Sequence, residues 1–126
     1  MLLNALFVFS VPDYEIRYLG SCRVSTQDQG LLSDLIRLHI LHHAVEGEIY
    51  GNWMIEELRR HGYRISPGTL YPMLHTLERK GYLRSRVEGV GRRARRLYRS
   101  TPQGRKALTI AKDRVRELFG ELIKGR

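Results

Sequence analysis

The chain has 126 residues and is 42% apolar, which suits one folded domain with its own core and excludes a disordered tail. Its single cysteine cannot form an internal disulfide, and no apolar run reaches the roughly 18 residues of a membrane span, so we expect a cytoplasmic protein without membrane contact. The net charge of +9 instead indicates an anionic partner, most often nucleic acid.

This charge is concentrated in one segment. Residues 59–106 hold 14 basic and 2 acidic residues, a net charge of +12, whereas residues 1–58 carry −5 and residues 107–126 carry +2. Because like charges oppose compaction unless an anion screens them, we expect the segment 59–106 to bind a polyanion. A basic surface that only confers solubility is the simpler alternative, and a charge this concentrated disfavours it.

Residues 1–30 predict no function. Two apolar runs, 6–11 and 14–19, fit short strands, and they fit equally well a flexible leader or upstream sequence from a misassigned start. The segment lacks the basic start and the cleavage site of a signal peptide. Cys22 beside Arg23 is weak evidence for a redox sensor. We therefore treat residues 1–30 as a leader of unknown role.

A first helix is predicted over residues 31–45. Nine of its fifteen positions are apolar and surround the axis, so one side should meet the domain core and another a partner chain. His39 and His43 have the i, i+4 spacing of a metal pair, and His42 lies between them. Since no acidic or cysteine ligand follows at a typical spacing, we expect partly buried or interfacial histidines and no metal site.

A second helix is predicted over residues 51–61, and Gly62 fits its left-handed C′ position. Its core face contains Met54 and Leu58. Trp53 lies about 150° from this face, so the core should not bury it. It is expected to cover the surface as a flat lid or, alternatively, to line a pocket for an aromatic small-molecule effector.

A third helix is predicted from the cap Ser66-Pro67 to Lys80, with a buried leucine stripe. Pro72 removes one backbone hydrogen bond, so this helix either begins near Tyr71 or tolerates a bend. The face opposite the stripe is slim and polar, as a recognition helix in a major groove requires; an ordinary solvated face is the alternative. The residues expected to contact DNA from this helix are Ser66, Gly68, Thr69, Tyr71, Pro72, His75 and Arg79.

A two-stranded hairpin is predicted next, from strands at 82–87 and 94–100 around a turn at 88–93. Four arginines should gather at its tip, where mobile guanidinium groups suit phosphates or a narrow minor groove. Within a strand, alternation would send Arg93 and Arg95 to one face and Arg92 and Arg96 to the other. These four residues complete the expected DNA contacts.

A last helix is predicted to open at the cap Thr101-Pro102. Its apolar residues follow a 3-4-3-4 spacing over about two heptads, a seam too short to be stable alone. This seam and the surplus apolar side of the first helix would both be buried in a two-fold dimer. The residues expected to dimerise are Leu35, Leu38, Leu108, Ala111, Val115, Leu118, Phe119 and Leu122.

These elements predict a mainly α fold with a two-stranded β wing, a winged helix-turn-helix with dimerisation helices at both ends. We divide the chain into the leader (1–30), a winged-helix DNA-binding domain (31–104) and a C-terminal dimerisation helix (105–126). No catalytic or cofactor-binding motif is visible, so we expect neither an enzyme nor a cofactor.

The central run resembles the signature of PadR-type winged-helix transcriptional regulators, in the compact subfamily with a single C-terminal helix. It reads Ile65-Ser66-Pro67-Gly68-Thr69-Leu70-Tyr71-Pro72-Met73-Leu74, then Leu77-Glu78-Arg79-Lys80-Gly81-Tyr82-Leu83, with Tyr50-Gly51 before it and Arg96 to Gly104 after it. The resemblance covers roughly residues 31–123. The first thirty residues depart from it, and so does Trp53, at a usually polar position.

The resemblance implies a homodimeric, usually repressing regulator that binds double-stranded operator DNA through the third helix and the wing. Paired recognition helices imply an inverted-repeat operator with half-sites about one helical turn apart, and a small-molecule effector would release the DNA. The alternative is a winged-helix module for protein or RNA contact without operator control, because this fold serves both purposes.

Overall fold

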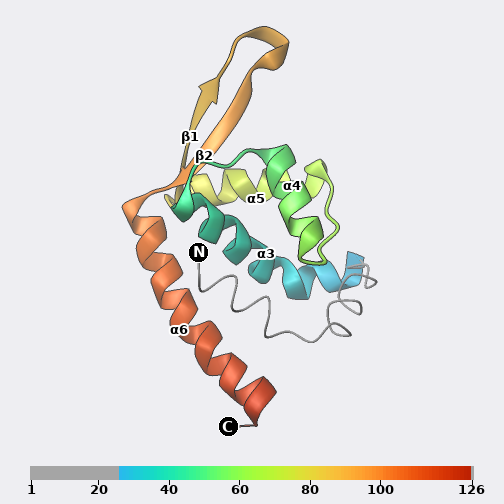
Figure 1. Ribbon diagram of the computed structural model, residues 1–126, viewed down its shortest axis with the longest axis vertical. Coiled ribbons are helices and arrows are strands. Elements are labelled where there is room, and N and C mark those ends of the chain that lie inside the picture. Colours follow the sequence, from blue (N-terminus) through green and yellow to red (C-terminus); the bar gives the residue numbers. More distant parts are fainter. Residues whose placement is uncertain (1–25, 126) are drawn as a thin grey trace.

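A computed structural model describes residues 26–125 of the chain (Figure 1). In chain order, its elements are α3 (Thr26–Glu46), α4 (Gly51–Arg60), α5 (Pro67–Arg79), β1 (Leu83–Glu88), the 3-10 turn η1 (Gly91–Arg93), β2 (Arg95–Ser100) and α6 (Pro102–Lys124). The predicted mainly α fold with a two-stranded wing is confirmed. The strands considered at 6–11 and 14–19, and Cys22, lie outside the described residues.

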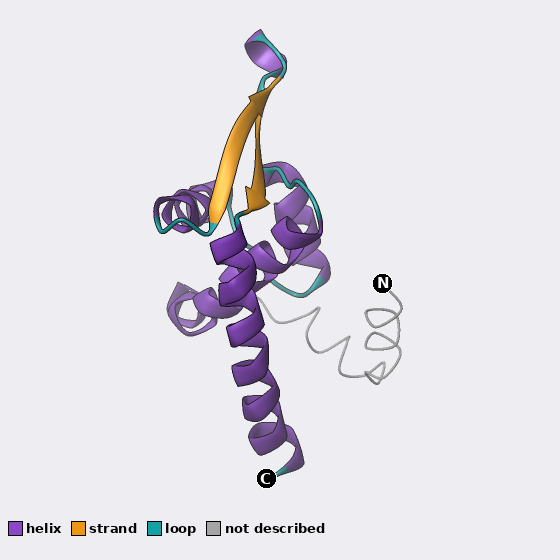
Figure 2. Ribbon diagram, turned by 90° about the vertical axis from the view of Figure 1, so that its left-hand side faces the viewer, coloured by secondary structure: helices purple, strands orange, loops and turns teal. Residues whose placement is uncertain are grey.

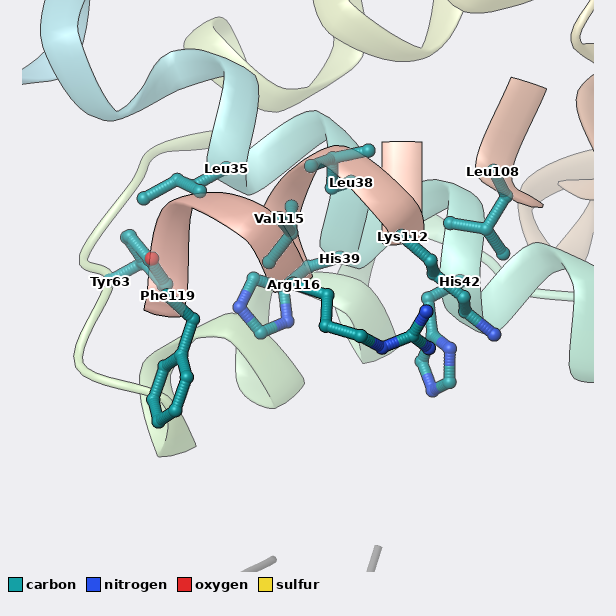
Figure 3. Close-up of a pocket in the computed structure, with 10 residues that line it drawn as sticks. All are labelled: Leu35, Leu38, His39, His42, Tyr63, Leu108, Lys112, Val115, Arg116 and Phe119. Carbon is teal, nitrogen blue, oxygen red and sulfur yellow. The ribbon is translucent and has the colours of Figure 1, made fainter. Parts of the chain in front are cut away.

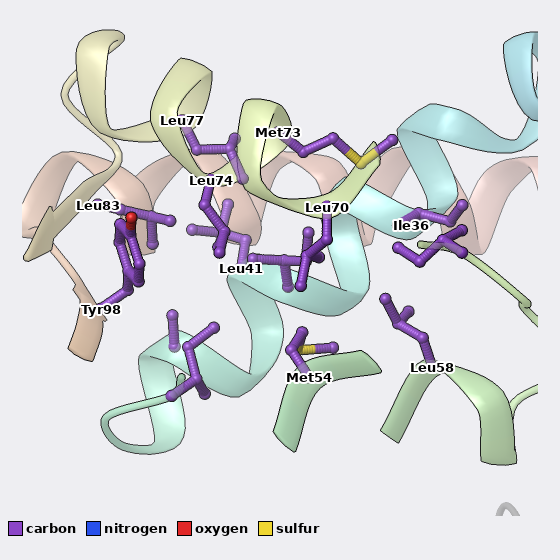
Figure 4. Packing of buried hydrophobic residues seen from close by; sticks show 14 of the residues in the cluster. Ile36, Leu41, Met54, Leu58, Leu70, Met73, Leu74, Leu77, Leu83 and Tyr98 are labelled. Atoms are coloured by element: carbon purple, nitrogen blue, oxygen red, sulfur yellow. The ribbon is translucent and has the colours of Figure 1, made fainter. Parts of the chain in front are cut away.

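The three helices α3, α4 and α5 and the base of the wing enclose one apolar core (Figure 4). Every predicted core residue of α5 is buried: Leu70, Met73, Leu74 and Leu77. The fully buried side chains of the other elements are Ile36 and Ile40 of α3, Met54 and Leu58 of α4, and Tyr98 of β2. Burial of each such side chain stabilises the fold by about 1.5–3 kcal/mol, so this core holds α4 and α5 in a fixed relation.

The helix ends follow from the residues at the caps, except for the start of α3. Gly62 follows α4 with φ of +90°, the left-handed geometry predicted for it, and Gly81 follows α5 with φ of +86°. Helix α5 runs unbroken through Pro72, so it tolerates the lost hydrogen bond rather than starting later. Helix α3 begins at Thr26, five residues before the predicted start.

The wing is an antiparallel hairpin that projects from the helical body (Figures 1 and 2). Ile49, just before α4, exchanges two backbone hydrogen bonds of 2.8 Å with Tyr98 and so ties the hairpin to the body. At the far end, η1 occupies the turn. Arg92 and Arg93 lie on η1, within the turn predicted at 88–93, so strand alternation does not apply to them; Arg95 and Arg96 lie on β2.

Helix α6 begins as predicted, with Thr101 as its cap. The Thr101 hydroxyl accepts a hydrogen bond from the Gly104 N–H (3.0 Å) and donates one to the Gly81 carbonyl (2.6 Å). Leu108 is buried, and the helix then extends beyond the body (Figure 2). None of the helices in residues 26–125 combines the length and apolar character needed to cross a membrane.

Replacement of Tyr98 by Phe should not destabilise the protein. The Tyr98 side chain is fully buried, its hydroxyl has no hydrogen-bond partner among the described residues, and burial raises its pKa. Because an unsatisfied buried polar group is costly, Tyr98→Phe should raise the free energy of unfolding by about 1 kcal/mol. Chemical denaturation of both proteins measures the change, and a loss of stability would show that the hydroxyl has a partner in solution.

Candidate nucleic-acid interface

Helix α5 lies beside the base of the wing (Figure 1), and its face opposite the buried stripe is exposed to solvent. The residues predicted to lie opposite its buried stripe are all exposed: Gly68, Pro72, His75 and Arg79. Ser66 occupies the N-cap, yet its side chain makes no hydrogen bond to the α5 backbone. The first turn therefore keeps an uncapped, electropositive end that suits a phosphate.

Tyr71 lies differently from the other predicted contacts on α5. Its side chain is half-buried and packs against the first residue of α4, where a Cβ added to Gly51 would overlap the Tyr71 ring and hydroxyl. Thus Gly51 lets the two helices of the helix-turn-helix approach each other through Tyr71. Sequence reasoning assigned Tyr71 only to DNA and did not find this role in packing.

The four wing arginines fall into two pairs. Arg92 and Arg93 lie in the exposed tip, and neither forms an ion pair within residues 26–125. Arg95 has partners, because it pairs with Glu88 at 3.4 Å and its guanidinium lies 4.2 Å from the centre of the Tyr50 ring. Arg96 donates a 3.0 Å hydrogen bond to the Ser85 hydroxyl. Only the tip pair is thus wholly available to an outside anion.

A bidentate ion pair fixes the wing relative to the helices. Arg86 on β1 donates hydrogen bonds of 2.7 and 2.8 Å to the two carboxylate oxygens of Glu48 in the loop before α4. The hydrogen bond from Arg86 holds the pKa of Glu48 below its ordinary value. The partners are 38 residues apart in sequence, and sequence reasoning missed this pair.

The wing is also tied to α5. Glu78 near the end of α5 accepts hydrogen bonds from the Ser85 backbone N–H (2.9 Å) and hydroxyl (2.6 Å). The same hydroxyl accepts the bond from Arg96. A chain of polar contacts therefore joins the exposed α5 face to β2, so the two parts of the proposed interface are held together.

An apolar cavity of about 640 Å³ lies between α3 and α6 (Figure 3), and no residue of the wing lines it. Residues expected to dimerise line it from both helices, Leu35 and Leu38 from α3 and Val115 and Phe119 from α6. Trp53 is not among its lining residues. It is 38% exposed, so it lies outside the core as predicted, and its ring meets that of His43 edge-on at 5.3 Å.

The histidines of α3 have neighbours that the sequence analysis did not anticipate. The ring nitrogens of His39, His43 and His61 all lie within 4.8 Å of one another. Glu57 Oε1 is 3.6 Å from His43 Nε2 and 3.3 Å from His61 Nε2. The three α3 histidines are partly buried, as expected, and the structure adds Glu57 and His61 as spatial neighbours that the spacing on the first helix did not reveal. Glu57 on α4 and His61, the C-cap residue of α4, have the same i, i+4 spacing, and this second pair was the signal available in the sequence.

Comparisons with known proteins agree with this geometry. Residues 40–110 match the family described as "Transcriptional regulator PadR-like family". The chain is 56% identical over 90 residues to transcriptional regulator Rv3488 of Mycobacterium tuberculosis, an overlap of 71% of this chain and 84% of that protein. The family match runs from within α3, through α4, α5 and the wing, into the start of α6.

Solved structures show the same fold. A PadR family transcriptional regulator from Eggerthella lenta superposes with a TM-score of 0.68 at 29% identity, covering 80% of this chain and 89% of that one. Bacillus subtilis PadR, solved in complex with operator DNA, superposes with a TM-score of 0.53 at 20% identity, covering 60% of this chain and 44% of that one. At the latter identity, the likeness concerns the fold alone.

Proposed function

The chain belongs to the PadR-like family of transcriptional regulators, which are not enzymes, and from this premise we propose that it is a homodimeric repressor of an inverted-repeat operator. The observation that carries the proposal is the exposed face of α5 beside a wing whose tip arginines have no acidic partner among the described residues. A polar helix face can reach base edges in a major groove, while arginines on a wing bind phosphates. The complex of Bacillus subtilis PadR with operator DNA supports this use of the fold.

In this proposal, residues 31–104 read DNA and residues 105–126 dimerise. Base-edge readout falls to Gly68, Thr69, Pro72, His75 and Arg79, and phosphate contacts fall to Ser66, the N-terminus of α5 and the wing. Tyr71 contributes through its position between α5 and α4. A dimer would place two copies of α5 about 34 Å apart, the spacing of successive major grooves on one face of DNA.

The experiment that tests the proposal is a binding assay with genomic fragments followed by footprinting. We expect a protected inverted repeat, and a reporter under that sequence should be less active when the protein is present. A winged helix used for RNA is expected to offer stacking aromatics, but α5 carries one tyrosine, and it is half-buried against Gly51. Competition by unrelated RNA as strong as by operator DNA would refute operator control.

Release of DNA by a planar aromatic effector is the finer part of the proposal. Trp53 remains the candidate contact because it is partly exposed and offers a flat ring. It is the only tryptophan of the chain, so its fluorescence reports such binding directly.

His75→Ala should lower the affinity for operator DNA more than the affinity for random DNA. The His75 side chain is exposed in the middle of the α5 face, where a base contact is worth about 1–3 kcal/mol of discrimination. We therefore expect the ratio of operator to nonspecific affinity to fall by about tenfold or more. Arg92→Ala is the contrasting variant, since a phosphate contact carries no sequence information and should leave this ratio unchanged. An unaltered ratio for His75→Ala would place His75 outside the groove.

A further inference from the structure

Two pairs of metal-binding residue types face each other across the contact between α3 and α4. Helix α3 supplies His39 and His43, and the end of α4 supplies Glu57 and His61. Residues four apart lie on the same helix face, so each pair projects as a unit. The rings of His39 and His61 are 4.8 Å apart, and Glu57 Oε1 lies within 3.6 Å of the His43 and His61 nitrogens.

We propose that His39, His43 and His61, together with Glu57, form a binding site for a divalent transition-metal ion of the zinc class. Imidazole nitrogens suit Zn²⁺, Cu²⁺ and Ni²⁺, whereas Mg²⁺ and Ca²⁺ prefer oxygen ligands. Three histidines and one carboxylate also match the four ligands of a tetrahedral zinc site.

The geometry needs only small adjustments. In a tetrahedral site with bonds near 2.1 Å, neighbouring ligand atoms are about 3.4 Å apart, and the three ring nitrogens here already lie within 4.8 Å of one another. His61 is exposed at the end of α4, and its ring already lies 4.8 Å from that of His39. Glu57 is only 14% exposed, and Arg60 holds its other oxygen at 3.2 Å. The carboxylate is thus oriented by an outer partner, as ligands of metal sites commonly are.

Burial and neighbouring charges shift the pKa values of three residues in this cluster. Burial, followed by the neighbouring His61, His43 and His42, lowers the pKa of His39 to about 4, and burial lowers the pKa of His43 as well. Burial raises the pKa of Glu57, but the histidines and the hydrogen bond from Arg60 outweigh it and hold this pKa below its ordinary value. Burial thus favours the neutral imidazole forms of His39 and His43, and neutral imidazole is the form that binds metals.

A second histidine group, His42, His43 and Glu46, is the weaker candidate. All three belong to α3, and Glu46 is half-exposed. The cluster with His61 and Glu57 instead joins two helices. A metal there would fasten α4, the first helix of the helix-turn-helix, to α3, which carries the proposed dimer surface. We therefore expect metal binding to stabilise the folded protein, because a ligand that binds only the native state raises its stability.

Trp53 provides the readout, since the one tryptophan of the chain lies 5.3 Å from the His43 ring. Untagged full-length protein, stripped with a chelator that is then removed, is titrated with NiCl₂ or CuCl₂. Either paramagnetic ion bound at the site should quench Trp53 fluorescence, and ZnCl₂ should reverse the quenching by competition. Calorimetry with ZnCl₂ should give one site per chain, and saturating Zn²⁺ should raise the Tm by about 10 °C.

His39→Ala and His61→Ala should each weaken Zn²⁺ binding by more than about 100-fold, beyond the 10- to 100-fold typical of outer partners. Their far-UV circular dichroism without metal confirms folding. His42→Ala is the matched control, a neighbouring histidine outside the proposed set, and it should bind Zn²⁺ like the parent. No quenching at micromolar Ni²⁺ or Cu²⁺, or equal losses in His42→Ala and His61→Ala, would overturn the site.

Discussion

Replacement of Arg92 and Arg93 together by alanine is expected to weaken DNA binding by about 200-fold at 50 mM salt and by about 20-fold at 200 mM. Both side chains are exposed at the wing tip, and neither pairs with an acid within residues 26–125. Each phosphate contact contributes about 0.9 to the slope of log affinity against log salt, so losing two should make the slope shallower by about 1.8. The two affinity losses follow from this slope difference if the variant and the parent bind equally well at about 1 M salt, where counterion release contributes little.

Arg95→Ala with Arg96→Ala is the matched control. It removes the same charge from the same wing, but Arg95 already pairs with Glu88 and stacks on Tyr50, and Arg96 bonds to Ser85. We expect a smaller change in the salt slope from this control pair. Both double variants should affect operator and random DNA equally, because phosphates carry no sequence information. Binding isotherms from 50 to 200 mM salt measure both slopes. Equal slope changes for the two double variants would contradict the inference that only Arg92 and Arg93 of the four are free to bind phosphates.

The elements of the fold were predictable because their determinants are local. Ser66-Pro67 and Thr101-Pro102 start helices, and Gly62 and Gly81 end them, each through the conformation of one or two residues. The buried stripe of α5 follows from its apolar spacing alone. A helix start without such a marker was less predictable, and α3 begins five residues before the predicted position.

The parts of the site that were not predicted depend on contacts between distant residues. Arg86 and Glu48 are 38 positions apart, and nothing in either neighbourhood marks them as partners. Likewise, Tyr71 meets Gly51 only because α4 and α5 pack closely. The four wing arginines look alike in the sequence. Their environments differ because Arg92 and Arg93 lie on η1 at the tip, whereas Arg95 and Arg96 lie on β2.

The histidine cluster shows how much an adjacent helix changes such an interpretation. His39 and His43 alone are two ligands, which is too few for a metal site. The missing pair, Glu57 on α4 and its C-cap His61, has the same spacing, so complementary i, i+4 pairs on consecutive predicted helices were the pattern that links the four residues. Packing of α3 against α4 converts two weak patterns into one candidate site.

Replacement of Leu118 and Leu122 together by glutamate should convert the proposed dimer into a monomer. Helix α6 continues 16 residues, or about 24 Å, beyond buried Leu108, and its seam there is exposed, with Leu118 at 50% and Leu122 at 69%. Leu31 and Leu35 of α3 are also exposed, at 82% and 41%. Neither of these two apolar surfaces, on α6 and on α3, is covered within residues 26–125, and a two-fold partner would bury both. Truncation after Lys106 removes the same seam and should leave monomeric or poorly soluble protein.

Loss of the dimer should also uncouple the two recognition helices. A monomer contacts one half-site, so operator affinity should fall by at least about 100-fold, the lower end of the gain from linked binding, while weak binding to random DNA persists. Ile110→Glu is the matched control, because Ile110 is about as exposed as Leu118, at 55% against 50%, but projects about 80° from Leu118 and about 120° from Leu122 around α6, at the edge of the seam. It should stay dimeric in analytical ultracentrifugation. Two results would refute this arrangement. The first is a parent protein that sediments as a stable monomer, and the second is a Leu118→Glu, Leu122→Glu variant that keeps full operator affinity. Both follow from the role assigned to α6, because dimerisation is the only part of the proposal that requires this helix to extend beyond the body.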